Sequence, residues 1–139
     1  MRRVLALRAM VATGWSQRRI ADMLGVSQSA VSQQIRSAPD LSLVHPEKLL
    51  QSAAPVLKAL AGELGYERLA VFGSVARSEA RQDSDIDLIV QAPVGTSSFD
   101  FLKFKHLVEQ ILDRTVDVIS YGGLTSATDD DIRRDAVLL

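Results

Sequence analysis

Two carboxylates one residue apart stand at the start of an apolar run in the stretch GSVARSEARQDSDIDLIV, residues 73–90. On a strand, residues i and i+2 point to the same face roughly 6–7 Å apart, so Asp85 and Asp87 project side by side while Ile86 faces the interior. Two parallel carboxylates repel each other unless a cation lies between them. Because all these donors are oxygens, the pattern indicates Mg²⁺ rather than zinc.

A third carboxylate, Asp117, lies in the middle of the apolar stretch VDVIS, residues 116–120. A segment of helix length separates this stretch from the first, so the two strands can be neighbours in one sheet. Three converging acids could hold two Mg²⁺ ions roughly 3.5–4 Å apart, which is the arrangement that binds both the attacking and the leaving oxygen in phosphoryl transfer. The sequence therefore predicts Asp85, Asp87 and Asp117 as metal ligands and catalytic residues.

The turn before the acids is predicted to bind phosphate groups. Gly73 and Ser74 follow an apolar strand and open a short helix, where backbone N–H groups and the serine hydroxyl can hold phosphate oxygens. Arg77 adds positive charge about one turn further on, and Ser84 stands next to the metal ligands. The stretch lacks the Gly-Lys-Ser/Thr of a P-loop, and no His or Cys is placed to activate Ser74 as a nucleophile.

Alternating strands and helices must position these residues. Short strands are predicted at 69–72, 85–90 and 116–120 from their apolar pattern. Helices are predicted at 47–64, from Ser97 or Ser98 to about 113, and after Thr128, where Asp129, Asp130 and Asp131 suit a helix start. Pro55 is expected to kink or divide the first of these helices.

The first part of the chain is predicted to fold as three short helices. A helix at 2–13 precedes two more, which Ser16 and Ser27 can cap. Gly25, between those two, can take a left-handed turn conformation. The stretch WSQRRIADMLGVSQSAVSQQIRS, residues 15–37, resembles the helix-turn-helix of phage-repressor-type regulators.

That resemblance implies that the third helix enters the major groove of double-stranded DNA. Gln and Ser can read base edges, and Arg can bind phosphates. The expected DNA-binding residues are Arg18, Arg19, Gln28, Ser29, Ser32, Gln33 and Arg36. One such unit reads only a few base pairs, so a homodimer is expected. The alternative is a three-helix packing module that touches no nucleic acid.

The distribution of charge favours the DNA-binding alternative. Residues 1–38 carry six arginines and one acidic residue, whereas the other 101 residues carry 10 basic and 16 acidic side chains. A packing module would leave this basic surplus unexplained, whereas a polyanion-binding module requires it.

Length and composition set the domain organisation. The chain has 139 residues, and Pro39 and Pro46 interrupt the helical pattern. We therefore expect a helix-turn-helix domain at 1–38, a linker at 39–46 and a second domain at 47–139. The absence of cysteine excludes disulfides and thiolate metal sites. No apolar run approaches the roughly 20 residues of a membrane span, and Arg8 interrupts the N-terminal apolar stretch, so a cytoplasmic protein is expected.

Residues 47–139 resemble the minimal nucleotidyltransferases of the DNA polymerase β-like superfamily. The pattern of that family is Gly-Ser, a short spacer, Ala-Arg-Gly-Glu-Ala, then Ser-Asp-x-Asp and a distant third Asp. The matching residues are Gly73, Ser74, Ala76, Arg77, Glu79, Ala80, Ser84, Asp85, Asp87 and Asp117. Ser78 departs from the pattern, because the family usually has Gly there. The resemblance implies an α+β chain whose second domain is a small mixed β-sheet flanked by helices.

The resemblance also implies an activity, the transfer of AMP from ATP to an acceptor hydroxyl with two Mg²⁺ ions. Asp85 and Asp87 would bind both ions, and Asp117 would complete one site and help deprotonate the attacking hydroxyl. Many minimal members look like MntA-type antitoxins, which add AMP to a tyrosine of a HEPN-type toxin, so a toxin protein is the expected acceptor.

Two alternatives remain open for the activity. The chain could be a DNA-binding transcriptional regulator whose pocket binds a nucleotide without turnover. It could also transfer AMP to a small molecule such as an antibiotic, although the second domain is too short to carry a separate acceptor-binding domain.

Overall fold

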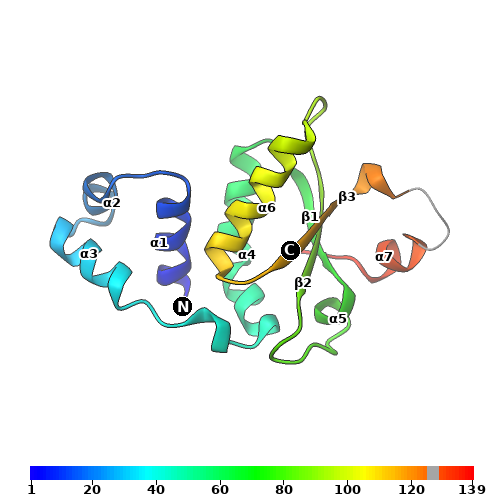
Figure 1. Cartoon of the computed structure of the whole chain (residues 1–139), viewed down its shortest axis with the longest axis horizontal. Coiled ribbons are helices and arrows are strands. Elements are labelled where there is room, and N and C mark those ends of the chain that lie inside the picture. Colours follow the sequence, from blue (N-terminus) through cyan, green and yellow to red (C-terminus); the bar gives the residue numbers. More distant parts are fainter. Residues whose placement is uncertain (125–128) are drawn as a thin grey trace.

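The computed structural model describes residues 1–124 and 129–139 and shows a helical N-terminal part beside a small sheet with helices on both faces (Figure 1). We call residues 1–38 the head, residues 39–45 the connecting segment and residues 46–139 the body. The head contains α1 (Arg2–Ala12), α2 (Gln17–Leu24) and α3 (Gln28–Arg36), and the connecting segment contains the short 3₁₀ helix η1 (Leu41–Leu43). None of the helices in these described ranges is long and apolar enough to cross a membrane.

The body contains four strands, four α-helices and one 3₁₀ helix within the described residues. In chain order they are α4 (Pro46–Glu63), β1 (Glu67–Phe72), α5 (Gly73–Ala76), β2 (Ile86–Gln91), α6 (Ser98–Leu112), β3 (Val116–Ser120), η2 (Tyr121–Gly123), α7 (Asp130–Asp135) and β4 (Val137–Leu138). The sheet has the strand order β3-β2-β1-β4. β1 pairs antiparallel with β2 and β4, whereas β2 pairs parallel with β3 through the crossover helix α6. This mixed sheet confirms the predicted α+β class.

The head forms the predicted helix-turn-helix, with the predicted local chemistry. The hydroxyl oxygens of Ser16 and Ser27 accept hydrogen bonds from the third backbone N–H of the following helix, each at 3.1 Å, and so cap α2 and α3. Gly25 ends α2 with φ +69°, a left-handed conformation that glycine adopts without steric cost.

The body confirms one of the predictions about its helices and corrects another. α4 runs continuously through Pro55, so the expectation that this proline could divide the helix was wrong. Ser97 caps α6 as predicted, since its hydroxyl accepts a bond from the Asp100 N–H at 3.0 Å. Thr128, the expected cap of the last helix, lies outside the described residues, and the short strand β4 that follows this helix was not predicted.

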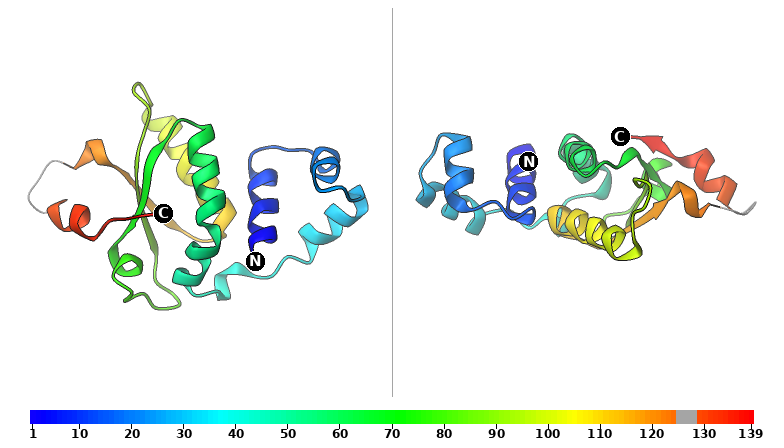
Figure 2. Two further views of the ribbon diagram at one scale, coloured as in Figure 1. Left: turned by 180° about the vertical axis from the view of Figure 1, so that it is seen from behind. Right: turned by 90° about the horizontal axis from the view of Figure 1, so that it is seen from above.

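The two faces of the sheet are covered differently. α4 and α6 cover one face and enclose the main core with the alternate strand residues Ile86, Leu88 and Val90. The other face carries a smaller cluster that includes Ile89 and receives Ile132 from α7. Figure 2 shows α7 on the side of the sheet opposite α4 and α6.

Helix α1 packs against both parts of the molecule. It lies between α2 and α3 on one side and α4 and α6 on the other (Figure 1). Leu5 is fully buried in the main core of the body, whereas Leu7 is buried with Ile20, Ala21 and Val31 in the small core of the head. A single helix therefore contributes to two cores.

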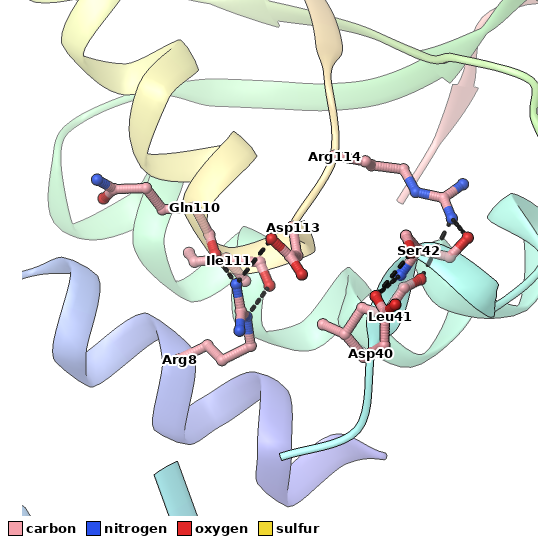
Figure 3. Close-up of polar contacts among 8 residues, drawn as sticks. All are labelled: Arg8, Asp40, Leu41, Ser42, Gln110, Ile111, Asp113 and Arg114. Carbon is pink, nitrogen blue, oxygen red and sulfur yellow. Dashed lines mark hydrogen bonds and ion pairs between the residues drawn. The ribbon is translucent and has the colours of Figure 1, made fainter. Parts of the chain in front are cut away.

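Arg8 of α1 also binds the end of α6 (Figure 3). Its Nε donates to the carbonyl of Ile111 at 2.9 Å, and its Nη2 donates to the carbonyl of Gln110 at 2.6 Å. Its Nη2 also lies 3.6 Å from a carboxylate oxygen of Asp113. The last carbonyls of a helix lack partners within the helix, and a positive charge there interacts favourably with the helix dipole. Arg8 therefore fixes the head on the body.

We predict that Leu5→Ala lowers the free energy of unfolding of the whole chain by about 3 kcal/mol, because it removes a buried side chain from the main core. Val11→Ala, on the same helix but 45% exposed, is the matched control and should cost less than about 1 kcal/mol. Urea denaturation followed by circular dichroism measures both. Equal effects of the two substitutions would contradict the contribution of Leu5 to the main core.

Candidate active site

The strand register brings the predicted acids together. Asp87 on β2 and Asp117 on β3 are directly opposite each other in the parallel pair, and Asp85 immediately precedes β2. Side chains on directly opposed residues of neighbouring strands lie on the same face. Because Leu88 and Val118 point into the main core, the acids point to the other face of the sheet.

The pKa of Asp87 reflects both its partial burial and the acids beside it. Partial burial is the main cause that raises the pKa of Asp87 from 3.8 to about 6, followed by the negative charges of Asp117 and Asp85 and by a hydrogen bond with Asp117. The positive charge of Arg77 acts in the opposite direction but is outweighed. Burial and the neighbouring carboxylates therefore both disfavour the charged form of Asp87.

The chemistry of this donor set fits Mg²⁺. All donors are carboxylate oxygens, which Mg²⁺ prefers, and a divalent cation would relieve the repulsion that raises the pKa of Asp87. Within residues 1–124 and 129–139, no three His, Asp or Glu side chains are already arranged as a metal cage. Asp85, Asp87 and Asp117 remain the predicted ligands.

Gly73 packs directly against Asp87. β1 and β2 pair with Phe72 opposite Asp87, so the chain turns into α5 beside that carboxylate. Gly73 has φ +73°, and a Cβ built on it would collide with Oδ2 of Asp87 and lie 3.2 Å from its Cγ. Glycine is thus required here for backbone conformation and for space, a second reason that the sequence pattern did not reveal.

Arg77 lies near the acids but is held by other residues. Its Nε donates to Glu79 at 3.1 Å, and its Nη1 donates to Asp135 of α7 at 2.9 Å. The hydrogen bond that Arg77 donates to Asp135 is the first cause of its raised pKa, followed by the hydrogen bond that it donates to Glu79. The sequence pattern gave no signal for Asp135, because it lies 58 residues away from Arg77.

The loop between α5 and β2 contains Ser84, a predicted nucleotide-binding residue, and Ser78, which departs from the family pattern. The Ser84 hydroxyl accepts a bond from the Arg81 N–H at 2.7 Å, so Ser84 closes a turn immediately before Asp85. Ser78, which replaces the usual glycine, has φ +58°. Non-glycine residues are disfavoured in this left-handed region, so the departure from the family pattern falls on a strained position.

The predicted DNA-binding residues lie on α2 and α3, which form one end of the molecule and are separated from β2 and β3 by α1, α4 and α6 (Figure 1). All are exposed except Ser32, which is half-buried: Arg18, Arg19, Gln28, Ser29, Gln33 and Arg36. The guanidinium of Arg19 stacks on the ring of Trp15, 3.7 Å from its centroid. Such a cation–π contact orients the side chain while leaving its donors accessible.

The structure thus has two opposed carboxylates beside a Gly-Ser turn on a mixed sheet. This is the arrangement that the sequence motif predicts for nucleotidyl transfer. Residues 55–138 match the sequence model of the nucleotidyltransferase domain, and residues 1–39 match that of Sigma-70, region 4. The chain therefore belongs to the nucleotidyltransferase domain family, with a helix-turn-helix head.

Individual relatives agree with this assignment. Protein adenylyltransferase MntA of Thermococcus cleftensis is 31% identical over 58% of this chain and 81% of its own length. A "putative protein adenylyltransferase" of Methanocaldococcus jannaschii is 37% identical over 52% of this chain and 78% of its own length. A solved structure of a "putative minimal nucleotidyltransferase" superposes with a TM-score of 0.60 at 35% identity, covering 74% of this chain and 99% of that one.

We predict that the metal-free protein loses stability as pH rises from about 4 to about 6. In that window the unfolded chain releases the Asp87 proton while the folded chain retains it, so deprotonation favours unfolding. Asp87→Asn cannot lose a proton and should be less sensitive to pH. Urea denaturation in EDTA at several pH values measures this difference.

The control is Asp83→Asn, because Asp83 is an exposed acid in the loop that precedes β2. This variant should follow the pH dependence of the unmodified chain. Parallel stability curves for the Asp87→Asn variant and the unmodified chain between pH 4 and pH 6 would contradict the charge repulsion described here.

Proposed function

We propose that this enzyme transfers AMP from ATP to a hydroxyl group of a partner protein. The observation that carries the proposal is the register of β2 and β3, which opposes Asp87 and Asp117 next to Asp85. The names of the relatives, which are protein adenylyltransferases, support a protein acceptor.

In the proposed reaction the acceptor oxygen attacks the α-phosphorus of ATP. A new oxygen–phosphorus bond forms, the bond from the α-phosphorus to the bridging oxygen breaks, and pyrophosphate leaves. Asp117 accepts the proton of the acceptor hydroxyl. Asp85 and Asp87 would hold two Mg²⁺ ions and Asp117 would complete one site, where the bound metal would supply positive charge to offset that of the phosphates. The contribution of the protein is therefore positioning and electrostatics.

The residues around the acids bind the nucleotide in this proposal. Gly73 and Ser74 offer backbone N–H groups and a hydroxyl at the start of α5, and Ser84 lies next to Asp85. Arg77 already lies close enough to lower the pKa of Asp87, so it can reach a phosphate near the acids by exchanging Asp135 for it.

The proposed acceptor is a tyrosine of a HEPN-type toxin, which would make the chain an antitoxin. A body of this size has no separate acceptor-binding domain among its described elements, and a protein acceptor supplies its own docking surface. A phenolic hydroxyl is also a good acceptor, because its pKa of roughly 10 makes it easier to deprotonate than an aliphatic hydroxyl.

The head is proposed to bind double-stranded DNA, as a homodimer, through α3. Its capped helices, its left-handed Gly25 and its exposed Gln and Arg side chains support this role. The DNA sequence upstream of the chain's own gene is the proposed site, since antitoxins of this design would control their own synthesis.

A second candidate function rests on Ser78. Its φ of +58° strains the turn beside the proposed triphosphate site, which favours a regulator that binds ATP without turnover. Binding of ATP and Mg²⁺ without pyrophosphate release in the presence of the acceptor would support this alternative.

For the catalytic proposal, we predict that Asp85→Asn combined with Asp87→Asn lowers AMP transfer at least about a hundredfold, because the metal ligands lose their charge. The assay incubates the protein with ATP labelled on the α-phosphate, Mg²⁺ and the product of the neighbouring gene. Labelled acceptor is measured after denaturing electrophoresis.

Asp83→Asn is the matched control for this assay, since it removes a charge from the same loop without touching the proposed ligands. It should retain transfer. Label transfer that survives the double substitution would reject the assigned chemistry.

For the head, we predict that Arg18→Ala and Arg36→Ala each weaken binding to all duplexes and reduce the slope of log affinity against log salt by about one. Gln33→Ala should weaken only binding to the upstream duplex, because it would remove a base contact. Fluorescence anisotropy at several salt concentrations measures both effects.

Lys58→Ala serves as the control, because Lys58 is an exposed cation on α4 of the body. It should leave the salt slope unchanged. Identical salt slopes for all of these arginine and lysine variants would contradict DNA binding through the head.

A further inference from the structure

The connecting segment lies against the two loops that lead into β2 and β3, the strands that carry Asp87 and Asp117. Nη2 of Arg114, three residues before Asp117, lies 3.2, 3.2 and 2.8 Å from the carbonyl oxygens of Leu41, Ser42 and Val44. Figure 3 shows this guanidinium facing the connecting segment. These contacts hold the chain that leads into β3.

The same segment is bonded to the loop between α5 and β2. Nε2 of Gln82 donates to the carbonyl of Leu43 at 2.8 Å, and Nε2 of His45 lies 3.0 Å from the carbonyl of Ala80. Leu41 anchors the segment, because its side chain is fully buried in the main core. The loop is thus tied to a connecting segment that Leu41 fixes on the body.

His45 connects the start of α4 to the loop before β2 through its two ring nitrogens. Its Nδ1 accepts a hydrogen bond from the Glu47 N–H at 3.2 Å and so caps α4. Because Nδ1 is an acceptor, the ring proton must be on Nε2, which can then donate to the carbonyl of Ala80. Both contacts require the neutral ring with this single tautomer.

The position of Ala80 makes this contact relevant to the site. Ala80 lies midway between Arg77 and Ser84, two of the residues proposed to bind the nucleotide, and five residues before Asp85. The segment from Arg77 to Asp85 contains no regular helix or strand, so its shape depends on individual hydrogen bonds.

We propose that His45 is a positioning residue for the nucleotide site, since it fixes the loop of residues 77–85 to the N-terminus of α4. The proposal rests on the proposed function for the identity of the nucleotide. His45 itself touches no reacting group in this scheme. It acts through Ala80 on Arg77, Ser84 and Asp85.

Two substitutions separate the two contacts of His45. The side-chain oxygen of Asn lies as many bonds from the backbone as Nδ1, so His45→Asn keeps a good helix cap but cannot reach Ala80. The side-chain nitrogen of Gln lies as many bonds from the backbone as Nε2, so His45→Gln keeps the donor to Ala80 and loses the cap. The two variants are therefore matched controls for each other.

The first measurement is hydrogen–deuterium exchange without nucleotide. In His45→Asn, exchange of residues 77–85 should be about fivefold faster, which is the effect of losing one typical hydrogen bond, while the first turn of α4 stays protected. In His45→Gln, the first turn of α4 should exchange faster and the loop should match the unmodified chain.

The second measurement is the affinity for ATP with Mg²⁺ by calorimetry, which needs neither turnover nor an acceptor. Affinity should fall about fivefold in His45→Asn and be retained in His45→Gln. A structural role confined to the helix cap would produce the reverse order.

Two results would overturn the proposal. One is loop exchange that is unchanged in His45→Asn or equally accelerated in both variants, and the other is equal ATP affinity in both variants. A failure of the unmodified chain to bind ATP would instead reject the proposed function, and the exchange contrast would still decide whether His45 holds the loop.

Discussion

The parallel pairing of β2 with β3 places Asp87 directly opposite Asp117, and the surroundings must compensate the charge of both carboxylates. The pKa of Asp87 rises to about 6, chiefly through partial burial and the charges of Asp117 and Asp85, while Arg77 supplies a partial counter-charge. Space is equally restricted, because the Asp87 carboxylate occupies the volume that any side chain at position 73 would need. The acids thus determine the residue type on the neighbouring turn and favour a cation at the site.

Much of this arrangement follows from local rules and could be predicted. The caps by Ser16 and Ser27, the left-handed Gly25 and the acid pair at Asp85 and Asp87 each depend on residues within a few positions. Asp117 was predictable because a helix of suitable length joins two apolar strands, which makes them parallel neighbours.

Contacts between distant residues could not be predicted in the same way. Arg77 bonds to Asp135, which is 58 residues away in the sequence, and Arg8 bonds to the carbonyl of Ile111, which is 103 residues away. Because charged side chains occur throughout the chain, the residues near each partner in the sequence give no sign of which two will pair. The strand β4 was not predicted for a related reason. Its two exposed residues pair with the edge of β1 and carry no periodic pattern of their own.

The domain boundary at residue 38 remains a prediction. Helix α1 shows why composition alone is a poor guide to that boundary, because Leu5 and Leu7 are both apolar and yet belong to different cores.

Helices α2 and α3 of the head lie at one end of the longest dimension of the molecule, and α1, α4 and α6 lie between them and the strands β2 and β3 that carry Asp87 and Asp117 (Figure 1). A duplex seated on α3 would therefore approach from the side away from Asp117. A bulky macromolecule could engage the acid-bearing edge at the same time without steric competition from the nucleic acid. The architecture thus permits a ternary complex of this chain, a duplex and an acceptor, in which the chain could modify the acceptor while it stays bound to DNA.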